Sequence, residues 1–259
     1  MPLHILAIGD IVGRPGRLFL RDRLARVVER EKIDFVVANG ENVAGGLGIT
    51  RATAHELHRY GVHVVTTGDH VWRRRDAPQA VREDPCLLRP HNFPPGAPGS
   101  GVVDTQAPEG TPIRVVNLLG RTFLDPVDCP FQCVERLLQE PDRPAVTIVD
   151  FHAEATSEKG AMGWFLDGRV SAVLGTHTHV QTADQRILDQ GTAYITDMGM
   201  TGSRRSILGR RTEQVVEKFR TRTYVPMEVA SGDVEMGGVV VSVDPRTGRA
   251  VDIRRIAES

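Results

Sequence analysis

The chain has few aromatic residues, few cysteines and almost no net charge. Aromatic residues make up 5% of its 259 residues, and Lys and Arg total 32 against 33 Asp and Glu, a formal net charge of −1. The balance excludes a protein that binds nucleic acid through a strongly basic overall field. Three cysteines, Cys86, Cys129 and Cys133, are too few for a disulfide framework.

Long hydrophobic runs are also missing. No apolar run approaches the roughly 20 residues that cross a bilayer. The N-terminal apolar stretch from Leu3 to Ile8 is too short for a signal peptide. We therefore expect a soluble, reduced, cytoplasmic protein with no membrane partner.

The residues that are present are typical of a folded globular protein. The hydrophobic fraction is 40% and the charged fraction 25%, enough for a sizeable core at this length. No internal repeat, low-complexity tract or linker-like shift of composition interrupts the chain. The Pro- and Gly-rich stretch from Arg89 to Gly101 predicts a long loop rather than a domain boundary. We expect one domain over residues 1–259.

Short apolar runs alternate with helix-like segments through the first two-thirds of the chain. Continuous runs that end in Gly or another turn residue predict buried strands, in LHILAIG, FVVANG, VHVVTTG and at Ile113–Leu119, Ala145–Phe151, Val170–Leu174 and Thr192–Thr196. The tail predicts an antiparallel hairpin, Gly238–Val243 and Ala250–Ile256. This order predicts an α/β fold, and periodicity does not choose between one mixed sheet and two.

Helices are expected between the early strands. Apolar residues recur at helical spacing from Leu18 to Glu29. Thr50 is a typical N-cap for a helix that runs to Tyr60, with Gly61 at its C′ position.

Five of the predicted strands end in side chains that can bind metal ions. In α/β sheets, ligands gather at the carboxyl ends of the strands, so these residues converge if the strands share one region. Polar turn residues explain any one of these ends, but they explain all five together less well. The residues in question are Asp10, Glu41, Asn42, Asp69, His70, His152, His177 and His179.

His177 and His179 are the most specific element of this set. Two residues apart on an extended chain, both imidazoles project to the same side. Histidine, carboxylate and amide ligands in this number exceed what one tetrahedral zinc needs. They match two neighbouring metal ions with a bridging carboxylate, which can hold a bridging hydroxide at neutral pH and suit phosphoester hydrolysis.

Other catalytic motifs are missing. Gly45-Gly46-Leu47-Gly48 lacks the order of a dinucleotide-binding loop, no Walker-type Gly-Lys-Ser/Thr follows a strand, and there is no G-x-S-x-G elbow. Cys129 and Cys133 are expected to be packing residues rather than a zinc site. The histidines at 4, 55, 58 and 63 are expected to be structural or solvated.

Several segments together resemble the bacterial YmdB-like branch of the calcineurin-type metallophosphoesterases. They occur in the family's order and cover most of the chain between Asp10 and Gly202: GDIVGRPGR, NGENVAGG, TTGDHVW, RPHNFPPGAPG, VVNLLGR, DFHAEATSEK, GTHTHVQTAD and TDMGMTG. The resemblance implies a four-layer α/β/β/α sandwich with mixed sheets. It also implies a phosphodiesterase for small substrates such as 2′,3′-cyclic nucleotides.

The resemblance implies roles for the candidate residues. Two divalent or mixed-valence ions are implied, commonly iron or manganese, with zinc and magnesium as alternatives. Glu41 would bridge the ions, and His70 would lie outside them and protonate the leaving alkoxide. One ion would be bound by Asp10, Glu41, Asn42 and His179, and the other by Glu41, Asp69, His152 and His177.

The chain departs from the family's pattern at Asp69, where the family usually has Asn. One hypothesis is that the extra negative charge weakens the Lewis acidity of the metals and repels phosphate. The alternative is that Asp69 favours a more highly charged metal such as ferric iron.

Two other functions stay open at this stage. One is a phosphomonoesterase or nucleotidase, and the other is a weakly active, metal-bound regulatory module. A small phosphodiester substrate is the expected partner. RNA-metabolism proteins and a second copy of the chain are the further partners considered.

Overall fold

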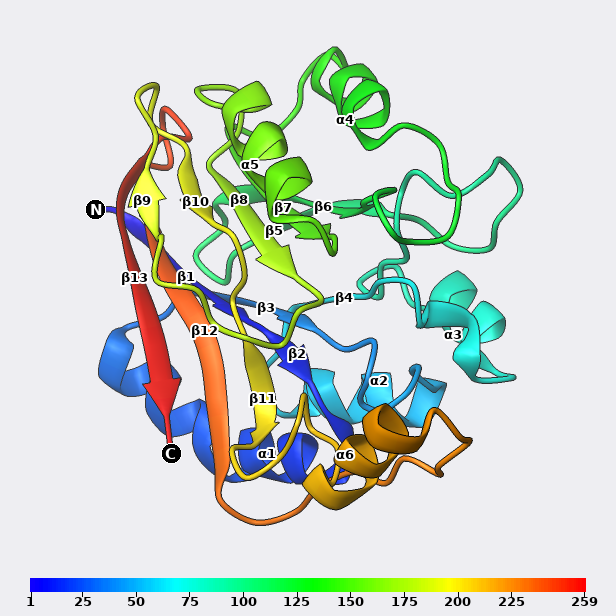
Figure 1. The fold of residues 1–259 in the computed structure, drawn as a ribbon. Coiled ribbons are helices and arrows are strands. Elements are labelled where there is room, and N and C mark those ends of the chain that lie inside the picture. The colour runs from blue at the N-terminus through cyan, green and yellow to red at the C-terminus, as the bar shows by residue number, and fades with distance from the viewer.

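The computed structural model describes all of residues 1–259, with six α-helices and two β-sheets (Figure 1). The first sheet has the order β2-β11-β12-β1-β3-β4, with β13 paired to β12. Its strands are β1 (Leu3–Ile8), β2 (Asp10–Ile11), β3 (Phe35–Asn39), β4 (Val64–Thr66), β11 (Met200–Ser203), β12 (Val234–Val243) and β13 (Ala250–Glu258).

The second sheet has the order β5-β6-β7-β8-β10-β9. Its strands are β5 (Val102–Gln106), β6 (Pro112–Leu119), β7 (Val146–His152), β8 (Ala172–Thr176), β9 (Arg186–Ile187) and β10 (Ala193–Ile195). Both sheets are mixed: β1, β3 and β4 are parallel in the first, and β6, β7, β8 and β10 are parallel in the second.

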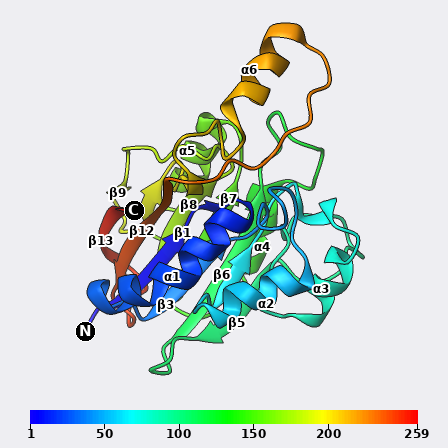
Figure 2. The same ribbon diagram turned by 90° about the horizontal axis from the view of Figure 1, so that it is seen from below.

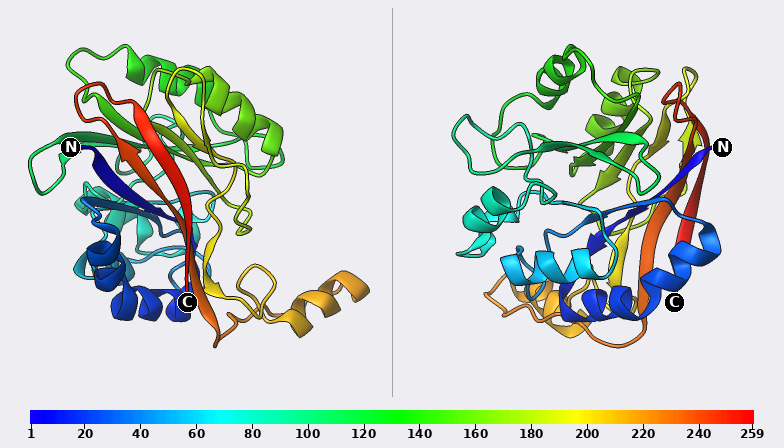
Figure 3. Two further views of the ribbon diagram at one scale, coloured as in Figure 1. Left: turned by 90° about the vertical axis from the view of Figure 1, so that its left-hand side faces the viewer. Right: turned by 180° about the vertical axis from the view of Figure 1, so that it is seen from behind.

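Helices cover the outer faces of the two sheets, which gives four layers in the order α/β/β/α (Figure 3). On the first sheet these are α1 (Gly13–Glu31), α2 (Arg51–Arg59) and α3 (Ala77–Glu83). On the second they are α4 (Pro130–Leu138) and α5 (Thr156–Phe165). The remaining helix, α6 (Thr212–Thr221), extends away from the sheets (Figure 2), and a 3-10 turn spans Val71–Arg73.

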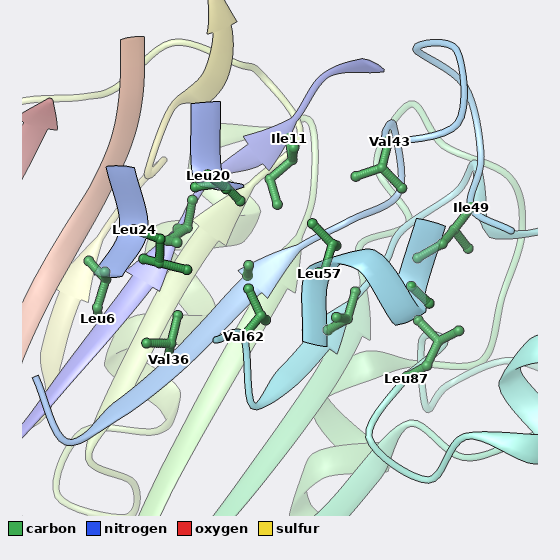
Figure 4. Packing of buried hydrophobic residues seen from close by; sticks show 14 of the residues in the cluster. Leu6, Ile11, Leu20, Leu24, Val36, Val43, Ile49, Leu57, Val62 and Leu87 are labelled. Atoms are coloured by element: carbon green, nitrogen blue, oxygen red, sulfur yellow. The ribbon is translucent and has the colours of Figure 1, made fainter. Parts of the chain in front are cut away.

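Side-chain alternation along the strands creates three separate cores. In β1, Leu6 and Ile8 pack toward the helices of the first sheet, whereas Ile5 and Ala7 pack against the second sheet. In β7, Ile148 lies between the sheets and Phe151 packs under α4 and α5. Figure 4 shows the first of these cores, with Leu20 and Leu24 of α1 against β1. Strands buried on both faces account for the continuous apolar runs in the sequence.

The structure confirms the predicted strands and the C-terminal hairpin, and it resolves the choice between one sheet and two. The segment from Arg89 to Gly101 is a loop, as expected. Thr50 caps α2 through a reciprocal pair of hydrogen bonds with Thr53, and Gly61 has a φ of 107° after the helix. Cys133, on α4, is buried in the core between that helix and the second sheet, and all three cysteines are free.

Two predicted boundaries differ from the structure. The first helix begins at Gly13, five residues before the predicted Leu18. The prediction missed this start because the first turn carries Arg14, Pro15 and Gly16 rather than an apolar stripe. The strand predicted at Val170–Leu174 runs instead from Ala172 to Thr176, in register with β7. No helix is long and apolar enough to span a bilayer.

Candidate metal centre

The five strand ends converge where the carboxyl edges of the two sheets meet. Asp10 opens β2 directly after β1, Glu41 follows β3 and Asp69 follows β4. His152 is the last residue of β7, and His177 follows β8. Each of Glu41, Asp69, His152 and His177 offers a ligand atom within 4.8 Å of the other three.

Glu41 lies between two groups of candidate ligands. Its Oε2 is 3.3 Å from Nε2 of His152, on the side of Asp69 and His177. Its Oε1 accepts a hydrogen bond of 3.0 Å from Nδ2 of Asn42. Because the two oxygens of one carboxylate face different groups, Glu41 has the orientation of a bridging ligand.

The second group is formed by Asn42, His179 and Asp10. Nε2 of His179 is 3.2 Å from Nδ2 of Asn42 and 3.7 Å from Oδ1 of Asp10. The structure thus brings together every residue that the sequence predicted to bind metal.

Two observations show that the residues fit metal ions. Oδ1 of Asp10 is buried and has no hydrogen-bond partner, which is costly for a carboxylate unless a cation completes its environment. A Cβ on Gly68 would overlap Glu41 and His152, so only glycine leaves this space free. The donors are carboxylate oxygens, an amide and three imidazoles, a set suited to divalent first-row metals.

Burial and charge shift the pKa values of the clustered groups in opposite directions. Burial raises the pKa of Asp10 to about 6, against the lowering effect of His179. Burial would lower the pKa of His152, but the carboxylates of Glu41, Asp69 and Asp10 raise it to about 10. Without a cation, therefore, the imidazole of His152 supplies the positive charge that these carboxylates need.

Each histidine in the cluster has a polar partner at the ring nitrogen that faces away from the other candidate ligands. Nδ1 of His179 lies 3.2 Å from the carbonyl oxygen of Leu208, and Nε2 of His177 lies 3.1 Å from Oε2 of Glu154. Such outer partners fix the ring orientation of metal-binding histidines.

His152 is oriented by a longer chain of hydrogen bonds. Its Nδ1 lies 2.9 Å from Oγ1 of Thr176, which donates a 2.6 Å hydrogen bond to Asp150. Asp150 also accepts hydrogen bonds from Thr66 and Asn39 of the first sheet. This buried carboxylate therefore links both sheets directly beneath the cluster.

His70 lies at the edge of the cluster, with its side chain about a quarter exposed at 27%. Its Nδ1 is 2.9 Å from Oδ1 of Asn42 and 3.1 Å from Oε1 of Glu41. Its Nε2 is 3.5 Å from Oδ2 of Asp69. Burial would lower the pKa of His70, but Glu41 and Asp69 raise it above the ordinary value.

Sequence reasoning missed Asp150, Thr176 and the carbonyl of Leu208. Asp150 carried a usable signal, because it is the one charged residue in the apolar run AVTIVDF. No local signal marks Leu208, whose carbonyl reaches His179 only through the path of the chain after β11.

An α/β/β/α sandwich with metal-binding side chains where its two sheets meet is the architecture of metallophosphoesterase-type phosphatases. A model of the YmdB-like protein family matches residues 6–256. The chain belongs to this family. It is 46% identical to a Bacillus subtilis (strain 168) protein named 2′,3′-cyclic-nucleotide 2′-phosphodiesterase, over 98% of this chain and 96% of that protein.

Two crystal structures of similar proteins share the fold. A protein of Thermus thermophilus, described as hypothetical, is 39% identical with a TM-score of 0.92, and the match covers 99% of this chain and 100% of that one. A protein described as a novel phosphatase, from Mycoplasma pneumoniae, is 33% identical with a TM-score of 0.92, over 100% of this chain and 95% of that one.

Proposed function

We propose that this protein is a dinuclear, metal-dependent phosphodiesterase that hydrolyses small phosphodiesters such as 2′,3′-cyclic nucleotides. The observation that carries the proposal is the orientation of Glu41, whose two carboxylate oxygens face separate groups of ligands. The similarity to the Bacillus subtilis phosphodiesterase supports the choice of substrate.

The ligand groups divide between two ions that share Glu41. Asp10, Asn42 and His179 would hold one, and Asp69, His152 and His177 the other. When bound, the ions supply an activated water and neutralise charge on the phosphoryl oxygens. We propose iron or manganese, because imidazole and oxygen donors without a thiolate suit these metals.

The reaction that we propose is hydrolysis with His70 as the proton donor. Water attacks phosphorus and releases one proton to the solvent, one P–O bond to the ribose breaks, and the cyclic phosphodiester opens to a phosphomonoester. His70 donates a proton to the leaving ribose oxygen as general acid. Its position, partly exposed and 3.5 Å from Asp69, supports this role, since the leaving oxygen must be reached from the solvent side of the ligands.

The proposal is tested by measuring metal content together with hydrolysis of 2′,3′-cyclic AMP, with manganese added. We expect about two ions per chain and turnover of the cyclic nucleotide. Two ions without turnover would contradict the phosphodiesterase and favour the regulatory module. A protein that binds no metal would contradict the proposal as a whole.

A phosphomonoesterase is the second candidate, because the similar Mycoplasma pneumoniae protein is described as a phosphatase. Comparing p-nitrophenyl phosphate with bis-p-nitrophenyl phosphate separates the two activities. A phosphodiesterase hydrolyses the diester faster, whereas faster hydrolysis of the monoester would identify a phosphomonoesterase.

A further inference from the structure

A buried ion pair lies beside the candidate centre without contacting its ligands. Nζ of Lys159, on α5, is 2.8 Å from Oδ2 of Asp197, which follows β10. Lys159 is 1% exposed and Asp197 is 0% exposed. Burying an ammonium and a carboxylate together carries a desolvation penalty that their mutual attraction must offset. A pair retained at that cost is a candidate for a role beyond stability.

The carboxylate of Asp197 accepts two backbone hydrogen bonds besides the lysine. Oδ2 accepts one of 3.0 Å from the amide of Thr178, the residue between His177 and His179. Oδ1 accepts one of 2.9 Å from the amide of Gly199. One side chain thus fixes the segment that carries both histidines to the turn before β11.

The segment that Asp197 fixes has an unfavourable backbone. His177 has a φ of 103° and His179 a φ of 63°, both in the left-handed region that residues other than glycine seldom adopt. A residue in this conformation persists only where surrounding contacts hold it. The backbone amide of His177 donates a hydrogen bond of 3.0 Å to Oδ2 of Asp10, and the amide of Thr178 donates one to Asp197.

The turn held by Asp197 also reaches a third candidate ligand. The carbonyl oxygen of Gly199 accepts a hydrogen bond of 3.0 Å from the backbone amide of Asp10. Through Thr178 and Gly199, Asp197 therefore connects to the backbone of both histidines and of Asp10.

The aliphatic part of the Lys159 side chain passes close to Gly175 on its way to Asp197. A Cβ on Gly175, in β8, would overlap the carbonyl oxygen of Thr196 and lie 3.2 Å from Cδ of Lys159. Glycine at this position lets α5 and β10 approach β8 closely enough for the ammonium to meet Asp197.

We propose that Lys159 and Asp197 are positioning residues, which hold His177, His179 and Asp10 in the geometry that binds the two metal ions. The lysine balances the charge of the carboxylate, and the carboxylate holds the strained histidine segment. This inference rests on the proposed function, because it assumes that these three residues bind metal.

The test compares manganese binding, by isothermal titration calorimetry, in the full-length wild type and two variants. Asp197→Asn keeps the shape of the side chain, but it leaves only one acceptor oxygen, so one of the two hydrogen bonds from Thr178 and Gly199 is lost. Lys159→Met keeps the stem and removes the charge. We expect each change to weaken manganese binding about 10-fold or more, the range typical for outer partners of metal ligands.

Two further readouts separate positioning from a general loss of stability. The amide of Thr178 should exchange with deuterium faster in both variants, at a pH and temperature where circular dichroism shows them folded. The double variant should bind manganese no more weakly than Lys159→Met, because the two residues act as one unit.

Arg114→Met is the matched control. Arg114 is a buried cation, 5% exposed, and it pairs with Asp104 of β5. It lies near the start of β6, at the end of that strand away from the candidate centre. We expect a lower melting temperature with unchanged manganese affinity.

The possible results distinguish failure of the positioning role from failure of the proposed function. Variants that bind manganese like the wild type, with only a lower melting temperature, would overturn the positioning role. A wild type that binds no manganese would instead contradict the proposed function. If Lys159→Met does not fold, the isosteric Asp197→Asn decides alone.

Discussion

At the scale of single residues, His70 is the group whose protonation matters most to the proposed reaction. One of its nitrogens is held by Asn42 and Glu41, and the other lies beside Asp69. A general acid matters most when the leaving group is a poor one, because a poor leaving group must be protonated as its bond breaks.

His70→Gln should therefore affect substrates unequally. We expect turnover of 2′,3′-cyclic AMP to fall by about 10²–10⁴-fold, because the ribose alkoxide is a poor leaving group. Turnover of bis-p-nitrophenyl phosphate should fall far less, since p-nitrophenolate leaves without a proton. The comparison is made at equal metal content, and equal losses on both substrates would contradict the general-acid role.

Asp69 adds a third carboxylate beside Asp10 and Glu41. The presence of Asp69 in place of the family's usual Asn has a second consequence in the structure, because the charge of Asp69 helps raise the pKa of His70. An acid with a higher pKa releases its proton less readily to the leaving oxygen.

Asp69→Asn should consequently raise the rate of phosphodiester hydrolysis several-fold. The neutral amide removes a negative charge that repels phosphate and that makes His70 a weaker acid. The rate is measured alongside metal content, and an unchanged or lower rate with both ions still bound would favour the ferric-iron alternative.

At the scale of secondary-structure elements, α2 and α3 are linked by the pair of His58 and Asp84. Nε2 of His58 lies 3.0 Å from Oδ2 of Asp84, just after α3. Burial would lower the pKa of His58, but Asp84 and the carbonyl of Val62 raise it above the ordinary value. A raised pKa means that protonated His58 stabilises the fold.

This stabilisation should depend on pH in a defined direction. It is fully present below the unfolded pKa of about 6.5 and is lost as pH rises through the higher folded value. We expect the wild type to lose more stability than His58→Gln between about pH 6 and pH 8. Urea unfolding at both pH values measures the difference, and parallel curves for the two proteins would refute the link.

The sequence predicted nine of the strands and the first two helices because their signals are local. Continuous apolar runs marked the strands buried on both faces, and Thr50 and Gly61 marked the two ends of α2. The start of α1 was missed because its first turn has no apolar stripe. The helices α3, α4, α5 and α6 were not predicted, and of these α6 buries only Val215. Elements that bury little apolar surface leave little pattern in a sequence.

At the scale of the whole molecule, each sheet contributes one kind of candidate ligand. The first sheet supplies the carboxylates and the amide, at Asp10, Glu41, Asn42 and Asp69, and the second supplies the three imidazoles, at His152, His177 and His179. The sequence could place these residues at strand ends. Periodicity could not show that two sheets face each other, because their packing depends on contacts between residues far apart in the chain, and only the family resemblance implied it.

Metal ions bound between the sheets should stabilise the whole fold. At 100 times the dissociation constant, binding to the native state adds about 2.7 kcal/mol. For a chain of this size we expect removal of metal with a chelator to lower the melting temperature by about 5–10 °C. Differential scanning calorimetry with and without manganese measures the shift, and identical melting temperatures would speak against ions that join the two sheets.

The central claim is that two metal ions share Glu41 where the sheets meet. Anomalous X-ray scattering from crystals grown with manganese tests it most directly. We predict two peaks about 3.5–4 Å apart on either side of Glu41. One should lie among Asp10, Asn42 and His179, and the other among Asp69, His152 and His177. A single peak, or peaks away from Glu41, would contradict the account.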